Sequence, residues 1–269
     1  IAEVIEENYG KYDGFIVLHG TDTMAYTASA LSYMFQNLNK PVILTGSQLP
    51  IGEIRTDAKS NLITAAEIAC GNVVVPEVCI CFNNQLFRGN RAEKFTSSKF
   101  DAFQSINYPS LAEAGTEINY NHDAIREVNN NALKVKTHFN NSVMIFKLFP
   151  GVNEKVLSAI LKSGALKGLI IETYGSGNAP KNEKLLKQLG DAVKNQMVIV
   201  NVSQCSGGVV QMEKYENGLA LKRAGVVSGH DMTTEAAITK LMFLLGSEMD
   251  YQEIKVNMQL DMAGELSRE

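Results

Sequence analysis

The sequence of 269 residues lacks two features that would have set its class at once. Its longest apolar runs hold four or five residues, as in Leu241–Leu245, whereas a membrane-spanning helix needs roughly 20. Basic residues are not concentrated either, since the net charge is −4 and no block of five basic residues occurs. These absences argue against a membrane span and against nucleic acid as a main partner.

Cysteine is scarce, and Cys70, Cys79, Cys81 and Cys205 are too few and too scattered for a disulfide framework. Cys79 and Cys81 lie two residues apart in an apolar run, so we expect them on one face of a strand. Their Cβ atoms would then be too far apart for a bridge. The composition predicts reduced, mostly buried cysteines in a cytoplasmic protein.

Sequence signals for metals and cofactors are also missing. The histidines at positions 19, 122, 138 and 230 show no metal-ligand spacing. Gly175-Ser176-Gly177 lacks the third glycine of a dinucleotide-binding loop, and no P-loop occurs. We therefore expect no metal and no cofactor.

Short apolar runs alternate with longer segments of helical period. Phe15–Leu18, Pro41–Thr45 and Val78–Phe82 read as strands, and helices are expected from about Met24 to Leu38 and from about Thr56 to Cys70. Strands that are apolar on both faces and separated by helices predict an α/β fold. Its sheet would be parallel and covered by helices on both sides.

The alternation stops between Glu117 and Phe139, where asparagines are frequent and apolar residues are few. It resumes with expected strands at 143–149, 168–171 and 197–202 and helices at 153–162, 182–189 and 233–245. We predict an N-terminal domain over residues 1–118, a linker over 119–139 and a smaller α/β domain over 140–269.

The most informative segment is His19–Thr23, between the strand Phe15–Leu18 and the following helix. Open parallel sheets bind ligands at the carboxyl ends of their strands, and a helix N-terminus favours an anion. Gly20 permits close backbone approach, Thr21 supplies a hydroxyl, and Asp22 supplies a carboxylate for an ammonium group. Neighbouring side chains diverge, so we expect the last two to contact opposite ends of a zwitterion rather than one atom. Both residue types are also ordinary helix caps, and that reading stays open.

A threonine hydroxyl or a water molecule becomes a nucleophile only when a base is near. His19 is the local candidate, although it follows an apolar strand and also fits a hydrogen-bonded core histidine. The polar run Asn83–Lys94 reads as a solvated loop. A lysine base would need its ordinary pKa, about 10.4, to be lowered by burial or hydrogen bonding.

The hexapeptide His19–Met24 resembles the second threonine signature of the L-asparaginase/glutaminase family. Segments along nearly the whole chain are similar to the cytoplasmic (type I) bacterial branch of that family. They are Thr45–Pro50, Phe87–Arg91, Lys94, Phe100–Phe103, Tyr174–Pro180 and Gly229–Thr233.

The resemblance implies a larger α/β N-terminal domain with a mostly parallel sheet and a smaller flavodoxin-like C-terminal domain. It implies hydrolysis of L-asparagine to L-aspartate and ammonia without a cofactor. Thr21, Lys94 and Asp22 match a hydrogen-bonded catalytic triad, whose aspartate also holds the α-ammonium group of the substrate. Gly20, Thr21 and Asp22 are accordingly expected to contact the substrate.

Two further residues and an oligomeric state follow from the same resemblance. Ser47 falls where the family offers a backbone carbonyl to the substrate amide. Asn178 resembles a residue that enters the site of the neighbouring subunit across an intimate dimer, and two such dimers form a tetramer. Some members of the branch are activated by asparagine near a cysteine-containing loop that Cys205 resembles, and the resemblance leaves regulation here open.

The chain departs from the family at one decisive point. Thr-Gly-Gly-Thr-Ile, the signature that carries the acyl-enzyme nucleophile, does not occur in these 269 residues. We expect an opening segment with a sheet strand and this threonine to belong to a longer natural protein, of which the chain starting at Ile1 omits residues. Two alternatives remain: an amino-acid-binding regulator without catalysis, and an ammonia-supplying subunit of a tRNA-dependent amidotransferase.

Overall fold

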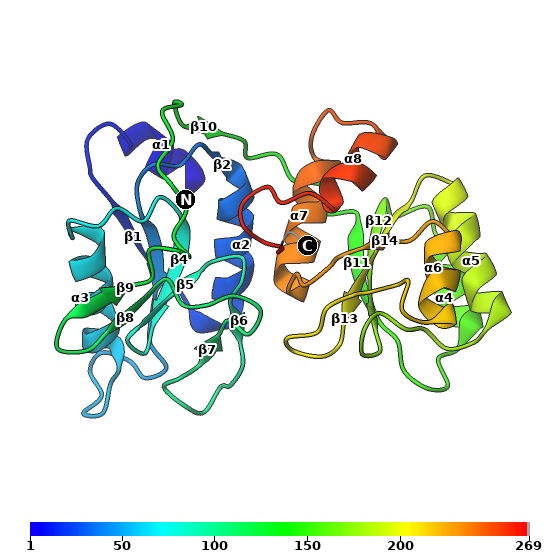
Figure 1. Cartoon of the computed structure of the whole chain (residues 1–269), viewed down its shortest axis with the longest axis horizontal. Coiled ribbons are helices and arrows are strands. Elements are labelled where there is room, and N and C mark those ends of the chain that lie inside the picture. Colours follow the sequence, from blue (N-terminus) through cyan, green and yellow to red (C-terminus); the bar gives the residue numbers. More distant parts are fainter. Residues whose placement is uncertain (268–269) are drawn as a thin grey trace. The chain divides into compact units, whose positions relative to one another are not determined.

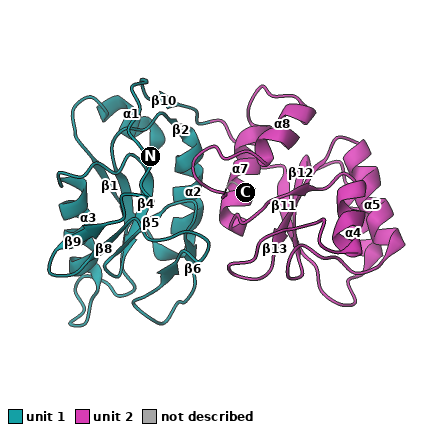
Figure 2. Cartoon of the chain, in the orientation of Figure 1, with its two compact units in different colours: residues 1–137 teal, residues 138–269 magenta. Residues whose placement is uncertain are grey.

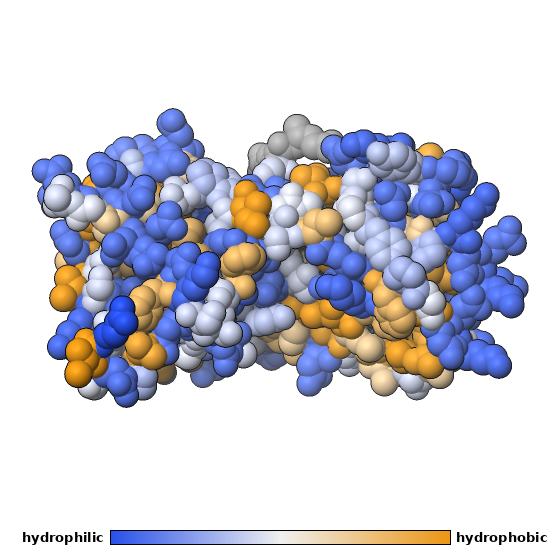
Figure 3. All heavy atoms as spheres, turned by 90° about the horizontal axis from the view of Figure 1, so that it is seen from below, coloured by the Kyte–Doolittle hydropathy of each residue, from blue (hydrophilic) through white to orange (hydrophobic). Residues whose placement is uncertain are grey.

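The chain divides into two compact units, residues 1–137 and 138–269 (Figure 2). A computed structural model describes residues 1–267. Within that range, no helix has both the length and the apolar character needed to cross a bilayer. The face drawn in Figure 3 is largely hydrophilic, with smaller apolar groups between the polar residues.

The first unit is built on a six-stranded sheet with the order β1-β3-β4-β5-β8-β9 (Figure 1). The β1, β3 and β4 strands are parallel, and the remaining neighbours pair antiparallel. The strands are β1 (Phe15–Leu18), β3 (Val42–Thr45), β4 (Val78–Phe82), β5 (Gln85–Arg88), β8 (Ala112–Ala114) and β9 (Ile118–Tyr120).

Side-chain alternation along the parallel strands builds a core on each face of this sheet. Val42 and Leu44 of β3 pack with α1 (Ala2–Asn8) and α2 (Met24–Met34). Their neighbour Ile43 packs on the opposite face with α3 (Ala58–Ala69). Helices on both faces of an apolar sheet confirm the α/β class expected from the sequence.

Cys79 and Cys81 both lie buried in the core on the α3 face, as their spacing predicts. All four cysteines are free thiols. Cys70 and Cys205 are exposed, however, so the expectation of mostly buried cysteines is wrong for these two.

The antiparallel half of the sheet arises from a tight turn after β4. Asn83 and Asn84 have φ angles of +47° and +64°, a pair of left-handed residues that suits a two-residue hairpin. The chain therefore returns as β5 beside β4 instead of crossing over a helix. The prediction that Asn83–Lys94 is a solvated loop is wrong, because Leu86–Ala92 is buried throughout.

Two short antiparallel pairs complete the first unit. β2 (Phe35–Gln36) pairs with β10 (Lys134–Val135), and β6 (Glu93–Lys94) pairs with β7 (Phe103–Gln104). β10 lies inside the segment 119–139, for which we expect a linker, and residues up to 137 belong to the first compact unit. The domain and linker boundaries drawn from the sequence stay a prediction.

The second unit is built on a parallel sheet with the order β11-β12-β13-β14. Helices α4, α5 and α6 cover one face, and α7 and α8 cover the other (Figure 1). The strands are β11 (Val143–Lys147), β12 (Gly168–Thr173), β13 (Val198–Ser203) and β14 (Val227–Ser228). The helices are α4 (Glu154–Leu161), α5 (Glu183–Lys194), α6 (Glu216–Arg223), α7 (Thr234–Leu245) and α8 (Tyr251–Met258).

Candidate active site

The His19–Thr23 loop leaves the carboxyl end of β1 and enters α2 through a short 3-10 turn, Thr21–Thr23. Gly20, at the start of the 3-10 turn, has no side chain to cap it, and Thr23, at the start of α2, forms no capping bond through its side chain. The side-chain bonds of Thr21 and Asp22 go to residues outside the loop. Thr21 and Asp22 therefore do not act as helix caps, the alternative that the sequence had left open.

Lys94 brings the threonine and the aspartate together. Its Nζ lies 2.7 Å from Oγ1 of Thr21 and 2.7 Å from Oδ1 of Asp22. An ammonium group donates in several directions at once, so one nitrogen bonds both side chains. The expectation that Thr21 and Asp22 contact opposite ends of a bound zwitterion stays a prediction. The resulting cluster lies wholly in the first unit.

The β6–β7 hairpin fixes the lysine. Lys94 pairs with Phe103 across the hairpin, and Phe103 is buried in the core beside Phe82 at a ring-centroid distance of 5.0 Å. The amide of Gln104 donates to Glu93 over 2.9 Å. A core aromatic residue thus anchors the backbone from which the lysine extends, and only 16% of the Lys94 side chain is exposed.

The aspartate is far more accessible than the lysine, with 92% of its side chain exposed. The hydrogen bond from Lys94 and the charge of its ammonium group lower the pKa of the Asp22 carboxyl group. Asp22 is therefore an anion at neutral pH, and it remains open to a ligand that carries an ammonium group.

A second loop, at the carboxyl end of β3, approaches the first. A Cβ on Gly46 would lie 2.3 Å from the carbonyl oxygen of His19, so only glycine permits this approach. Ser47 follows in this loop, and the Thr21 hydroxyl donates to Oε1 of Gln48 over 3.2 Å. Gln48 is not among the site residues predicted from the sequence, although its place after a parallel strand is a signal that could have identified it.

His19 does not contact the Thr21 hydroxyl through any bond that the structure shows. Its ring Nδ1 donates to the carbonyl of Gly20 over 2.7 Å, and the Thr27 hydroxyl donates to Nε2 over 3.0 Å in the neutral tautomer that satisfies both bonds. These bonds agree with the hydrogen-bonded histidine rather than with a base that acts on Thr21, although His19 is half-buried and not part of the core. Lys94, and not His19, bonds the Thr21 hydroxyl.

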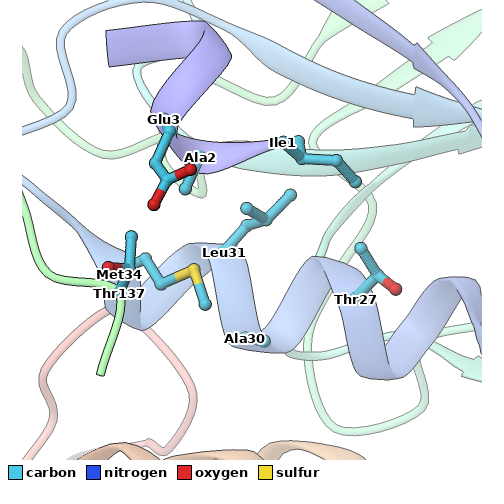
Figure 4. A pocket seen from close by; sticks show the side chains of 8 residues that line it. All are labelled: Ile1, Ala2, Glu3, Thr27, Ala30, Leu31, Met34 and Thr137. Atoms are coloured by element: carbon cyan, nitrogen blue, oxygen red, sulfur yellow. The ribbon is translucent and has the colours of Figure 1, made fainter. Parts of the chain in front are cut away.

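A cavity of about 360 Å³ lies beside α1 and α2, and Thr27 is one of its lining residues (Figure 4). Leu31 and Met34 face Ala2 and Glu3 across it. Its walls are mainly apolar, and Thr21, Asp22 and Lys94 are not among its lining residues. No group of residues suited to hold a metal ion occurs in residues 1–267.

Asn178 lies in the second unit, in a turn that follows β12. Tyr174 and Asn178 close the turn by a backbone bridge, and the Asn178 amide donates to the Ser176 hydroxyl over 3.5 Å. Gly177 has a φ of +97°, which favours glycine at this point of the turn. The expected contribution of Asn178 to a neighbouring subunit stays a prediction.

The two units match two parts of one known family. The model described as "Asparaginase, N-terminal" matches residues 1–126, and the "Glutaminase/Asparaginase C-terminal domain" matches residues 142–258. The chain therefore belongs to the asparaginase/glutaminase family, which confirms the resemblance found in the sequence.

Relatives and solved structures agree with this assignment. The chain is 45% identical over 267 residues to "L-asparaginase 1" of Escherichia coli K12, covering 99% of this chain and 78% of that protein. It is 42% identical over 269 residues to a mouse protein named "60 kDa lysophospholipase", covering 99% of this chain and 47% of the mouse protein. The crystal structure of L-asparaginase I from Vibrio cholerae superimposes with a TM-score of 0.93 at 44% identity, covering 99% of this chain and 80% of that one.

Proposed function

We propose that the protein containing this chain hydrolyses L-asparagine to L-aspartate and ammonia by acyl transfer. The cluster in which Lys94 bonds both Thr21 and Asp22 carries the proposal, together with the similarity to proteins named L-asparaginase. Hydrolysis of the side-chain amide consumes one water molecule and needs no redox step. No cofactor enters the proposal.

Lys94 and Thr21 form the part of the triad that acts on the reacting atoms. In the described arrangement Lys94 donates to Oγ1 of Thr21, while the Thr21 hydroxyl donates to Gln48. An ammonium group placed in this way polarises the hydroxyl oxygen. To take the proton from Thr21 or from an attacking water molecule, Lys94 must first lose its own, and the hydroxyl hydrogen must turn from Gln48 towards Nζ.

Asp22 and the neighbouring loops bind the substrate. The exposed carboxylate of Asp22 pairs with the α-ammonium group, and the backbone around Gly20 approaches the ligand closely. Ser47 presents its carbonyl to the amide from the loop after β3. An N-terminal threonine of the family signature, which these 269 residues do not contain, is the proposed acyl-enzyme nucleophile.

The resemblance to the type I branch supports three further parts of the proposal. We propose an intimate dimer in which Asn178 reaches the neighbouring site, a homotetramer formed by two such dimers, and a cytoplasmic location. Sedimentation tests the oligomer. The dependence of rate on asparagine concentration tests activation at a second site, which the resemblance leaves open.

The experiment that tests the function is ammonia release by the complete encoded protein with L-asparagine and with L-glutamine. Release from asparagine supports the proposal, and its rate relative to glutamine gives the substrate preference. Binding of asparagine without release would contradict it and favour an amino-acid-binding regulator. Release that depends on a partner subunit and tRNA would favour the amidotransferase subunit instead.

A further inference from the structure

Asp57 stands at the N-cap of α3, yet its carboxylate forms no capping bond with that helix. The hydroxyl of the preceding residue, Thr56, accepts the amide of Ala58 over 3.0 Å instead. Aspartate at this position is usually explained as a helix cap. Here the carboxylate does not cap the helix, so its hydrogen-bond partners lie elsewhere.

The carboxylate of Asp57 turns back onto the loop that follows β3. The backbone amide of Gln48 donates to both of its oxygens, each over 3.0 Å, and the amide of Leu49 donates to Oδ1 over 3.1 Å. Bonds from amides to a carboxylate are stronger than bonds between neutral groups. Two successive amides of the loop are therefore held by one fixed anion.

Asn61 continues this arrangement one helical turn later. It is buried, and its amide donates to the carbonyl of Gly46 over 2.9 Å and to Asp57 Oδ2 over 3.1 Å. Its Oδ1 accepts the backbone amide of Asn83 over 3.0 Å. Asparagine is a poor residue for a helix interior, so these bonds to two loops account for its presence.

The far side of the same loop reaches the Lys94 cluster. Gln48 accepts the Thr21 hydroxyl through Oε1 and donates through Nε2 to the carbonyl of Lys99 over 3.0 Å. The loop is thus fixed by α3 on one side and meets the reacting hydroxyl on the other. A shift of its backbone moves Gln48 and Ser47 together.

We propose that Asp57 is a positioning residue for the reaction, supported by Asn61. It sets the loop at residues 46–49 so that Gln48 orients the Thr21 hydroxyl and Ser47 presents its carbonyl. This inference rests on the proposed asparagine hydrolysis and adds two residues that touch neither substrate nor the reacting atoms. Misplacement of a site by about 1 Å costs roughly 100-fold in rate.

The test compares Asp57→Asn with Asp250→Asn in the complete protein. Asp250 is a matched control because it caps α8 in the second unit through the amides of Gln252 and Glu253. We expect Asp57→Asn to lower kcat at least tenfold, at a temperature where circular dichroism shows both variants folded. Asp250→Asn should keep kcat within twofold, although both variants lower Tm.

A conservative variant separates positioning from general stability. Asp57→Glu retains the charge and should recover part of the kcat that Asp57→Asn loses. A kcat of Asp57→Asn within threefold of the parent, or an Asp57→Glu variant as slow as Asp57→Asn, would overturn the inference.

A second readout does not depend on activity. Deuterium uptake by the peptide that spans residues 46–49 should be faster in Asp57→Asn than in the parent and in Asp250→Asn. If the parent releases no ammonia, the proposed function fails, and this exchange alone decides whether Asp57 holds the loop. Equal uptake in all three proteins would overturn it.

Discussion

Nζ of Lys94 lies 2.7 Å from Oγ1 of Thr21, although 73 residues separate the two in the sequence. The lysine comes from a hairpin anchored by the buried Phe103, and the threonine comes from the loop at the end of a parallel strand. Two rigid supports therefore hold the pair, which suits groups that must act together on one substrate.

The first prediction concerns this pair. Thr21→Val and Lys94→Met should each lower kcat for asparagine by about 10²–10⁴, the usual contribution of a positioned acid or base. Ammonia release measures the effect, and thermal unfolding checks that the variants fold. Lys147→Met is the control, because this lysine is largely exposed and pairs with Glu172 in the second unit. Rates within threefold of the parent for both site variants would contradict the roles given to them.

The second prediction concerns the ionisation of Asp22. Because Lys94 lowers the pKa of this carboxyl group, NMR titration should give a midpoint below the ordinary value of about 3.9. The ion pair then contributes to stability above the ordinary pKa, and that contribution is lost as pH falls through the lowered value. In Lys94→Met the midpoint should return towards the ordinary value, and an unchanged midpoint would refute the stated cause.

The third prediction concerns the contact between the two loops. Gly46→Ala places a methyl group where only 2.3 Å separate it from the His19 carbonyl oxygen, so the loops must move apart. We expect at least a tenfold loss of kcat/KM together with a lower Tm. Gly52→Ala is the matched control, since no atom lies within 4 Å of its added Cβ. Parent-like kinetics in Gly46→Ala would show that this approach is not needed.

The fourth prediction concerns the thiols. Burial raises the pKa of Cys81 to about 12, and Cys79 is also buried with a strongly raised pKa, so neither forms the reactive thiolate at neutral pH. Cys70 and Cys205 are exposed. Titration of the folded chain with a disulfide reagent should therefore modify these two first and all four only after denaturation. Rapid modification of Cys79 or Cys81 in the folded chain would contradict the packing described here.

The fifth prediction concerns the buried ion pair between Glu77 and Arg88. Glu77 pairs with Arg88 and also accepts the backbone amide of Arg126 over 2.8 Å. Glu77→Gln leaves a buried charge without its counterion and should cost about 3–5 kcal/mol in urea unfolding. Glu213→Gln breaks an exposed pair with Lys222 and should cost at most about 1 kcal/mol. Equal losses in the two variants would show that the Glu77 pair is not desolvated.

The pattern of apolar residues predicted the parallel strands, because a strand that is buried on both faces is apolar at every position. Val78–Phe82 is apolar at every position and is a strand with those bounds. The antiparallel return at β5 was missed, because polar residues such as Arg88 and Asn90 looked solvated in sequence. Arg88 is buried against Glu77 and Tyr108, and such partners are visible only after folding.

By itself, the sequence determined the α/β class, the family, and the loop where Thr21 and Asp22 lie, because these depend on local period and on contiguous motifs. Only the tertiary structure decided that Lys94 meets both side chains at one nitrogen, that His19 is bonded elsewhere, and that Asp57 holds a loop rather than its own helix. The reason is physical: hydrogen-bond partners are selected by distance in space, and side chains far apart in sequence become neighbours only when the sheet and its helices have packed.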